Sequence, residues 1–400
     1  MEPAYLILVV IVGALATTVT VTFVVRIANL IHNRRLDAYQ ATVRAWIAEY
    51  AVGARNDPPP PARLRLEREV MRDDLRALAP QVTGTASARI AALFVEYGFV
   101  EAVHRDLESR NPLKRVRASD TLGILRVTEA VPWLREHLRD DPLLRLSCAR
   151  ALADLNDFQA LPEIISSLSE YHSSLVEVTD IVSSFGKPAV PILRPLLLSA
   201  PPEERRLAAR SLGQLRALEA VPELRVALDS SDDELAAAAA RALGRVGDRS
   251  SVPDLVRVLT SQRAWFVKVA AAHALGITHD EATPAILVRT LGARRWHLRN
   301  AAAESLRLMG ESGLDAAVAL LDEIPDRGIA HFAGLLDVAD ELDPVIERAA
   351  FGDQQLDRLV RRACLAGVHA RLDELAAGDG PCAAYSGAVL ATSRPMEIAA

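Results

Sequence analysis

The chain is poor in lysine, cysteine and aromatic residues, and each shortage narrows what it can be. Lysine occurs only at Lys114, Lys187 and Lys268, so arginine supplies nearly all of the 46 basic residues, a bias that we attribute to a GC-rich bacterial genome. Three scattered cysteines exclude a disulfide framework and a cysteine zinc site. With aromatic residues at only 4%, the apolar 50% of the chain is mainly Ala, Leu and Val, which suits thin, closely packed helices.

Sequence motifs of catalysis and nucleotide binding are also missing. The nine histidines are scattered without the HExxH spacing, and the chain contains no P-loop, no GxSxG and no GxGxxG motif at a strand-to-helix junction. A net charge of −6, spread along the chain, gives no bulk attraction to nucleic acid. We therefore expect no enzyme activity, no metal site and no cofactor.

What the chain does have is a period. Six prolines recur at a nearly constant interval, at Pro132, Pro162, Pro191, Pro222, Pro253 and Pro284. Self-similarity at a period of roughly 30 residues indicates stacked structural repeats. Proline is tolerated in the first turn of a helix, where its missing N–H costs no hydrogen bond, so each proline predicts the start of a helix.

The repeat unit reads as two helices joined by a short turn. In residues 130–155, the proline opens a first helix, Asp140-Asp141-Pro142 makes the turn, and residues 143–152 form a second helix. Alanines in the second helices let neighbours approach closely, and leucines fill the seam between layers. Glycines follow the last leucine of several second helices, and we expect them to end those helices in the left-handed conformation. They are Gly123, Gly213, Gly244 and Gly276.

These residues resemble HEAT repeats, of the bacterial type also found in phycobilin-lyase-like proteins, over about residues 85–325. The resemblance implies an all-α fold, a right-handed α-solenoid. It also implies a basic residue early in each second helix. Seven positions before the reference leucine stand Arg115, Arg145, Arg205, Lys268 and Arg299, but Val178 and Ala236 interrupt the series. Two interpretations are open: a hydrogen bond that braces the turn, or an anion-binding edge helped by the helix N-termini.

The strongest candidate for a working surface lies in two successive units. Trp265 and Trp296 are separated by one repeat interval, so they occupy equivalent positions near the starts of adjacent second helices. Tryptophan beside arginine is typical of binding hot spots. The predicted partner-binding residues are Arg263, Trp265, Lys268, Arg294, Trp296 and Arg299. The alternatives are that both indoles only cap their turns, or that they stack on a base or sugar.

The N-terminal region predicts a membrane span. Residues 5–25 contain no charged side chain, and a helix of that length is about 30 Å long, which matches one hydrocarbon core. A cleaved signal peptide would need a basic start and a shorter apolar core. Basic residues follow the span at Arg26, Arg34, Arg35 and Arg44. The positive-inside rule therefore predicts a single-pass inner (cytoplasmic) membrane protein with its N-terminus outside and its repeats in the cytoplasm.

The expected organisation has six parts. They are a transmembrane helix (4–26), an amphipathic neck helix (27–52), a Pro-rich linker (53–62), the HEAT-repeat solenoid (63–325), a C-terminal helical cap (326–376) and a disordered tail (377–400). The apolar stripe of the neck helix has two interpretations: packing on the repeats or the membrane surface, or pairing with a partner.

The function that these features favour is a membrane-anchored HEAT-repeat scaffold that binds a protein partner at the cytoplasmic face. The type of protein suggests a membrane-associated or envelope-assembly enzyme as the partner. One alternative is a lyase-like protein that handles a chromophore or other ligand, by analogy of fold alone. Another is a nucleic-acid binder that uses the arginine and tryptophan edge, although the net charge argues against nucleic acid as a partner.

Overall fold

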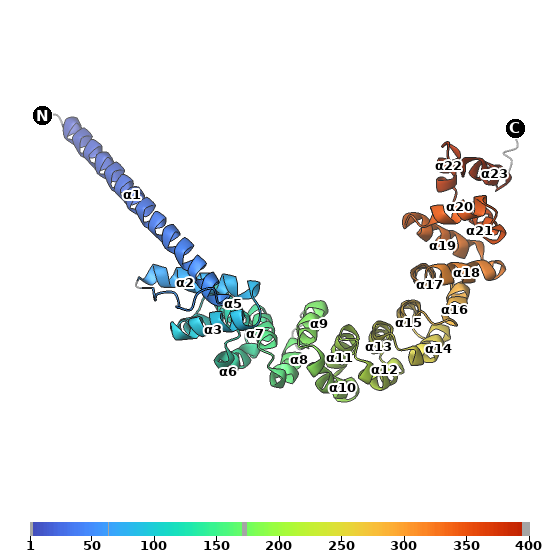
Figure 1. The fold of residues 1–400 in the computed structure, drawn as a ribbon, viewed down its shortest axis with the longest axis horizontal. Coiled ribbons are helices and arrows are strands. Elements are labelled where there is room, and N and C mark those ends of the chain that lie inside the picture. Colours follow the sequence, from blue (N-terminus) through green and yellow to red (C-terminus); the bar gives the residue numbers. More distant parts are fainter. Residues whose placement is uncertain (1–2, 63, 170–173, 394–400) are drawn as a thin grey trace. The chain divides into compact units, whose positions relative to one another are not determined.

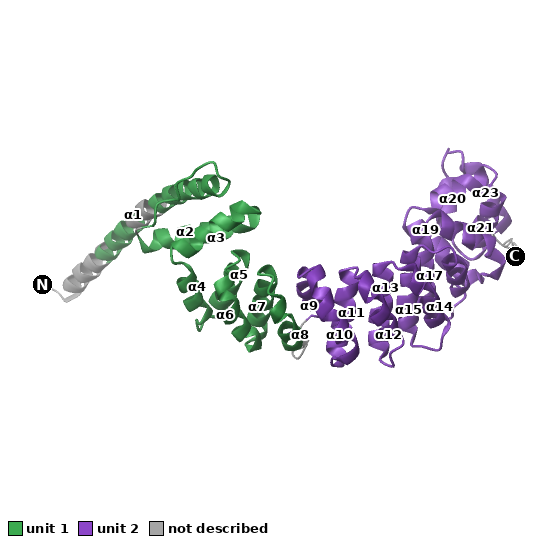
Figure 2. Cartoon of the chain, turned by 60° about the horizontal axis from the view of Figure 1, so that its bottom comes forward, with its two compact units in different colours: residues 1–167 green, residues 168–400 purple. Residues whose placement is uncertain are grey.

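The computed structural model describes residues 3–62, 64–169 and 174–393, without the side chains of residues 3–14, 16, 28–33 and 169. Every regular element in these residues is a helix, which confirms the predicted all-α class (Figure 1). The chain divides into two compact units, residues 1–167 and residues 168–400 (Figure 2).

Unit 1 joins a long N-terminal helix to the first repeats. Its helices are α1 (Pro3–Ala51), α2 (Arg65–Leu78), α3 (Thr85–Glu96), α4 (Val100–Leu107), α5 (Pro112–Ile124), α6 (Val131–Glu136), α7 (Pro142–Asp154) and the start of α8 (Leu161–Ser169). Helix α1 runs without a break through the predicted span and the predicted neck. The C-terminal part of α1 packs on α2 and α3, where Val43 and Ile47 are buried. The apolar stripe of the neck therefore packs against α2 and α3 of the same unit.

Among the residues whose side chains are described, no single helix is both long enough and apolar enough to cross a membrane. Much of the predicted span, residues 5–14, lies outside those residues.

Unit 2 continues the helical pairs. Its helices are α9 (Leu175–Ser184), α10 (Val190–Ser199), α11 (Pro202–Gln214), α12 (Val221–Leu228), α13 (Asp233–Val246), α14 (Val252–Thr260), α15 (Trp265–Thr278), α16 (Thr283–Thr290), α17 (Trp296–Leu308), α18 (Glu311–Ala319), α19 (Asp326–Val338), α20 (Leu342–Ala350), α21 (Gln354–Leu365), α22 (Ala370–Ala376) and α23 (Ala383–Ser393). We call the first helix of each pair outer and the second inner. Within unit 2, Figure 1 shows α11, α13 and α15 in a row, with α10, α12 and α14 on the other side.

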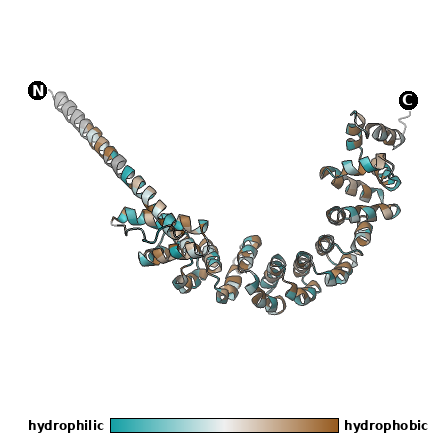
Figure 3. Ribbon diagram, viewed as in Figure 1, coloured by the Kyte–Doolittle hydropathy of each residue, from teal (hydrophilic) through white to brown (hydrophobic). Residues whose placement is uncertain are grey.

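The proline period marks the outer helices, as predicted. The prolines at 191, 222, 253 and 284 each stand in the first turn of α10, α12, α14 and α16, where no intrahelical N–H bond is lost. Polar and apolar residues alternate around most helices (Figure 3), so each helix buries one side against its neighbours. The inner helix α13 is the most buried, with every residue from Leu235 to Ala240 inaccessible to solvent.

The four repeat glycines do not cap helices, contrary to our expectation. Gly213 lies inside α11, and a Cβ there would sit 2.6 Å from the Cα of Ala242 on α13. The same 2.6 Å approach joins Gly244 to Ala274. Gly123 and Gly276 meet Ala151 and Ser305 in the same way. The glycines are needed because adjacent inner helices nearly touch, backbone to backbone.

The left-handed positions lie a few residues further on and are mostly not glycine. Arg126, Asn156, Arg216 and His279 have φ between 48° and 55°, while Gly247 takes the equivalent place after α13. The helix therefore continues past the repeat glycine and turns at a later residue. A non-glycine residue in this conformation costs roughly 1 kcal/mol or more, which the surrounding repeat contacts must offset.

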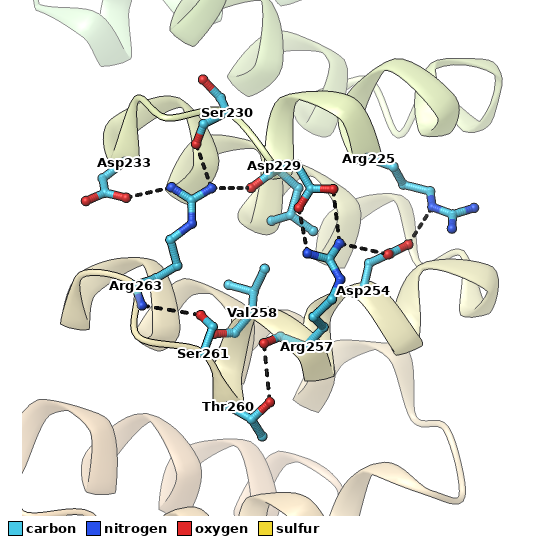
Figure 4. A network of polar contacts seen from close by, with 11 residues as sticks. Arg225, Asp229, Ser230, Asp233, Asp254, Arg257, Val258, Thr260, Ser261 and Arg263 are labelled. Atoms are coloured by element: carbon cyan, nitrogen blue, oxygen red, sulfur yellow. Dashed lines mark hydrogen bonds and ion pairs between the residues drawn. The ribbon is translucent and has the colours of Figure 1, made fainter.

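Ion pairs join successive outer helices, and we call this set the outer belt. An arginine of one outer helix meets a carboxylate of the next outer helix, of the preceding one, or of the turn that follows the preceding one. The pairs are Arg135–Glu163 (2.6 Å) in unit 1, and Arg194–Glu223 (2.6 Å), Arg225–Asp254 (2.6 Å), Arg257–Asp229 (2.7 Å) and Arg371–Asp343 (2.5 Å) in unit 2. Figure 4 shows the part around Arg257, which bonds both Asp229 and Asp254.

The C-terminal region departs from the expected cap and tail. Contacts between inner helices continue from α17 through α19 and α21 to α23, so pairing does not stop at residue 325. Within the predicted cap, α21 and α22 are separated at Gly367, whose φ is 99°. Within the tail that we expected to be disordered, residues 383–393 form α23, which buries Val389 and Leu390. Weak sequence patterning concealed this helix because only one short side of it is buried.

Candidate partner-binding site

The basic residue at the start of the inner helix braces the preceding turn. Arg145 is only 1% exposed, and it donates from Nε to the carbonyl oxygen of Leu138 at 2.8 Å and from Nη2 to that of Asp140. Arg115 repeats this with the carbonyl of Leu107 and pairs with the acidic turn at 140–141. These bonds satisfy carbonyls at the end of the outer helix, which supports the bracing interpretation of the series.

The predicted site residue Arg299 acts in the same way. Its Nη1 donates to the carbonyl oxygens of Ala293 and Arg294, each at 3.0 Å, so its guanidinium is held against its own turn. Lys268, at the equivalent place in α15, is half-buried. Arg299 is therefore a brace, whereas Lys268 stays a predicted contact.

Arg263 was also predicted to contact a partner, but the structure gives it a bracing role. Its guanidinium reaches back to the previous repeat, where it pairs with Asp233 (2.9 Å) and donates to the carbonyl oxygens of Leu228 and Ser230 (Figure 4). That repeat has Ala236 where a brace would stand. An arginine from the following repeat therefore replaces the missing one, and Arg263 has few donors left for a partner.

The two tryptophans are exposed and form part of a longer aromatic surface. Trp265 begins α15 and Trp296 begins α17, with 37% and 54% of each residue exposed. The indoles are not stacked on each other: His297 lies on Trp265, with ring centroids 4.6 Å apart and planes at 22°. Trp296 meets His297 and His331 edge to face, at 5.2 and 5.5 Å. We call these four side chains, on α15, α17 and α19, the aromatic row.

The charge around the row is set by a neutral His331 at one end and by two exposed arginines directly before Trp296. His331 accepts or donates a hydrogen bond with the Oδ1 of Asn300 at 3.1 Å, and burial together with the nearby Arg299 lowers its pKa. His331 is therefore neutral at pH 7. Arg294 and Arg295, just before Trp296, are exposed. A rigid aromatic surface beside accessible guanidinium groups can pack on an apolar side chain and pair with a carboxylate of the same partner.

Unit 1 carries a groove of about 820 Å³ between α2, α4 and α5 with many basic residues. Carboxylates are interleaved with these cations: Asp73 pairs with Arg117 at 2.9 Å, and Asp106 with Arg72 at 3.5 Å. Arg68 donates to the carbonyl oxygen of Tyr97 and lies over a phenyl ring. Because many of its cations already have protein partners, this groove is a weaker candidate than the row.

Nucleophile and metal chemistry find little support in the described part of the chain. Cys148 is a core residue, and burial raises its thiol pKa to about 12. A thiol that stays protonated at neutral pH is a poor nucleophile. No group of three or more His, Cys, Asp or Glu side chains that could hold a metal ion occurs among the described residues.

Comparison with known proteins identifies the repeats. The family model for HEAT repeats matches residues 190–276 and again 224–307. Residues 190–307 are therefore similar to HEAT repeats. No curated protein matches the chain. The HEAT repeats include both tryptophans and His297, while His331 lies beyond the matched residues.

Several solved structures are similar to the chain. Human deoxyhypusine hydroxylase is 19% identical, with 70% of this chain and 98% of that one covered and a TM-score of 0.28. The complex of CpcE and CpcF of phycocyanin lyase from Nostoc sp. PCC7120 is 22% identical, with 56% and 94% covered and a TM-score of 0.30. Kap121p is 13% identical, with 87% and 43% covered and a TM-score of 0.43. At these scores none of them bears on what this chain does.

The sequence missed two members of the aromatic row. His297 follows Trp296 directly, and its place between the indoles depends on the spacing of α15 and α17. His331 comes from α19, past the last recognisable repeat. A signal for His297 was present, because it follows Phe266 by one repeat interval and so shares a repeat position with another aromatic residue.

Proposed function

We propose that this protein is a scaffold whose HEAT repeats bind a protein partner through the aromatic row of unit 2. The observation that carries this proposal is the exposure of Trp296, at 54%, within a row of four aromatic rings. An indole that only capped its turn would be covered by the chain. Burying it under a partner would contribute a few kcal/mol, at about 25 cal/mol per Å² of apolar area.

The aromatic row is better suited to binding a protein than to binding a nucleic acid. The guanidinium groups of Arg263 and Arg299 are bonded to turns, so the cations left beside the rings are the half-buried Lys268 and the exposed Arg294 and Arg295. A strand of nucleic acid needs a continuous basic track along its phosphates. A hydrophobic side chain flanked by one or two carboxylates needs only the row and these two arginines.

The test is photo-crosslinking in native membranes. A photoreactive residue placed at Arg295 should capture a discrete protein, and Trp265→Ala/Trp296→Ala should reduce that capture by about tenfold or more, as expected for loss of a hot spot. Trp133→Ala is the matched control, because Trp133 stacks on His104 in unit 1, 3.9 Å between centroids, and is not part of the row. Equal capture by the double variant and the wild type would refute the site.

We further propose that residues 4–26 anchor the protein in the inner membrane, with the N-terminus outside and the repeats in the cytoplasm. The support is that the large apolar side chains described in this stretch are uncovered: Leu15, Val19 and Phe23 are each more than 60% exposed. Without a covering, such side chains favour hydrocarbon over water. The chain should resist carbonate extraction from membranes, and deletion of residues 4–26 should release it. An extractable full-length chain would contradict the anchor.

A further inference from the structure

Two adjacent inner helices of unit 2 carry arginines at equivalent positions. Arg210 on α11 and Arg241 on α13 are separated by one repeat interval, and each stands two positions before the reference leucine of its repeat. Arg245 follows Arg241 by one helical turn. The close approach of Gly213 to Ala242 holds these two helices together and so brings the cations near one another. We call Arg210, Arg241 and Arg245 the inner arginine cluster.

The cluster has no directly paired carboxylate among the described residues, and Glu234 acts on Arg210 and Arg241 without forming an ion pair. The neighbouring Arg206 is paired with Asp232 at 3.0 Å, but no member of the cluster has an ion pair among the described residues. The Nε of Arg210 is buried and has no hydrogen-bond partner there. A buried donor without a partner costs roughly 1–3 kcal/mol in the free protein, so an incoming acceptor would recover that energy.

The charges of the cluster also act on one another. Burial lowers the pKa of Arg210, the neighbouring Arg241 and Arg245 lower it further, and Glu234 opposes them. Burial likewise lowers the pKa of Arg241, with Arg245 adding to the effect and Glu234 opposing it. Both guanidinium groups remain charged at neutral pH. Their lowered pKa values mean that the charged forms are destabilised in the free protein. A bound anion would stabilise them.

A groove of about 490 Å³ opens beside the cluster, between α9 and α11. Its walls include Thr179, Arg210, Arg216 and Arg245. The carboxylate in its wall, Asp180, accepts a hydrogen bond from the Nε2 of Gln214 at 3.0 Å. The groove is therefore basic, with Gly213 in its wall where the inner helices touch.

The spread of the cluster indicates the size of the ligand. Residues four apart on one helix are about 6 Å apart, and packed helices lie about 8–10 Å apart. A single phosphate group is smaller than that area and would leave part of the cluster unneutralised. Carboxylates one helical turn apart on a peptide repeat at the same distance as Arg241 and Arg245.

We propose that the inner arginine cluster binds an acidic segment of the protein partner, with glutamate or aspartate side chains spaced by about one helical turn. This rests on the proposed scaffold role, but it uses residues separate from the aromatic row. The cluster supplies charge complementarity at one place on the repeats, and the row supplies apolar contact at another.

The test measures binding of a fluorescein-labelled helical peptide to the full chain in detergent by fluorescence anisotropy. The peptide carries glutamates one helical turn apart, and a glutamine version is the negative probe. Arg210→Gln/Arg241→Gln/Arg245→Gln should weaken binding of the glutamate peptide by more than about tenfold, since each charge-assisted bond contributes at least that factor. Arg225→Gln/Arg257→Gln, which changes the outer belt, should alter it by less than about twofold.

Three outcomes would overturn the proposal. They are equal binding by the triple variant and the wild type, displacement of the peptide by an equal concentration of inorganic phosphate, and tighter binding of a single-stranded oligonucleotide than of the peptide. Trp265→Ala/Trp296→Ala should bind the peptide like the wild type. If that variant loses partner capture but keeps peptide binding, both surfaces act as proposed. If capture is unchanged while peptide binding depends on the cluster, only the aromatic row is wrong.

Discussion

The outer belt and the inner arginine cluster use the same residue type in opposite ways. In the belt, Arg225 meets Asp254 at 2.6 Å, one repeat along the chain. In the cluster, Arg241 lies one helix away from Arg225 but has no carboxylate within ion-pair distance in the described chain. The belt joins repeats to each other, whereas the cluster leaves positive charge that the fold does not use. The number of arginines therefore says little about function. Whether a carboxylate lies within ion-pair distance separates a structural arginine from one that is available to a partner.

The largest expected effect comes from separating the inner helices α11 and α13. In Gly213→Ala, the new methyl group would lie 2.6 Å from the backbone of Ala242, so α11 must move away from α13. We expect a loss of about 1–3 kcal/mol in the free energy of unfolding, although alanine in a helix is normally up to ~1 kcal/mol better than glycine. Urea unfolding followed by circular dichroism measures this. The acidic peptide should also bind less well, although no arginine has been removed.

Gly334→Ala is the control for this change. Gly334 lies inside α19, and no atom lies within 4 Å of the place where its Cβ would stand. This variant should be unchanged or more stable by up to about 1 kcal/mol. If the two alanine variants unfold alike, close helix contact is not the reason for the repeat glycines.

A buried arginine that the fold does use should be costly to remove. Arg145→Met leaves the carbonyls of Leu138 and Asp140 without their donor, at about 1–3 kcal/mol of unfolding free energy. Arg145→Lys should recover little of this free energy of unfolding, because one ammonium group cannot reproduce the two-pronged hydrogen bonding of a guanidinium group. Arg150→Met, on the exposed side of the same helix, should lie within about 0.5 kcal/mol of the wild type. A loss as small as that of Arg150→Met would show that Arg145 is not a brace.

The comparison is sharpest between two arginines with the same substitution. Arg225→Gln removes a belt pair and should lower the unfolding free energy by about 0–1 kcal/mol, the usual range for exposed pairs. Arg241→Gln removes a partly buried charge and its repulsion from Arg210 and Arg245, which together outweigh the lost attraction to Glu234, so it should raise the free energy of unfolding by a few tenths of a kcal/mol. Thermal unfolding of both variants at low salt should show changes of opposite sign in the free energy of unfolding. Two losses of equal size would mean that the cluster is compensated after all.

Much of this contrast could not be predicted from the sequence. The proline period predicted the starts of the outer helices, and the repeat interval predicted that Trp265 and Trp296 begin adjacent inner helices. Both succeed because a repeat fixes which positions are equivalent. Arg210 and Arg241 were visible in the same alignment. Without distances between helices, however, they could not be told from arginines that have a carboxylate nearby.

The errors have a common physical reason. The repeat glycines were interpreted from local backbone preference, but the distance to Ala242 on the next helix determines why glycine is there. Arg263 was assigned to a partner because it stands beside Trp265, yet it braces the repeat before its own. In each case the deciding contact comes from a neighbouring repeat, about which a local pattern contains no information.

The smallest expected effect is a difference in pH dependence between the two sets of arginines. The hydrogen bond from Arg135 lowers the pKa of Glu163 below its usual value, despite some burial that opposes this. The folded state therefore holds this proton less tightly than the unfolded state. The stabilisation is fully present above about pH 4.3, the ordinary glutamate value, and is lost as the pH falls through the lower folded value. Comparing unfolding of the wild type and Glu163→Gln between pH 7 and pH 3 measures it.

The difference between the wild type and Glu163→Gln should be constant from pH 7 to about pH 5 and should shrink below that, since the protonated glutamic acid resembles glutamine. Arg241→Gln should behave otherwise. No carboxylate lies within ion-pair distance of Arg241 in the described chain, although Glu234 acts on it from further away, so its difference from the wild type should change much less over the same range. If the Arg241→Gln difference changed near pH 4 as much as the Glu163→Gln difference does, an acidic side chain of the protein would be neutralising the cluster, and no acidic partner would be needed to do so.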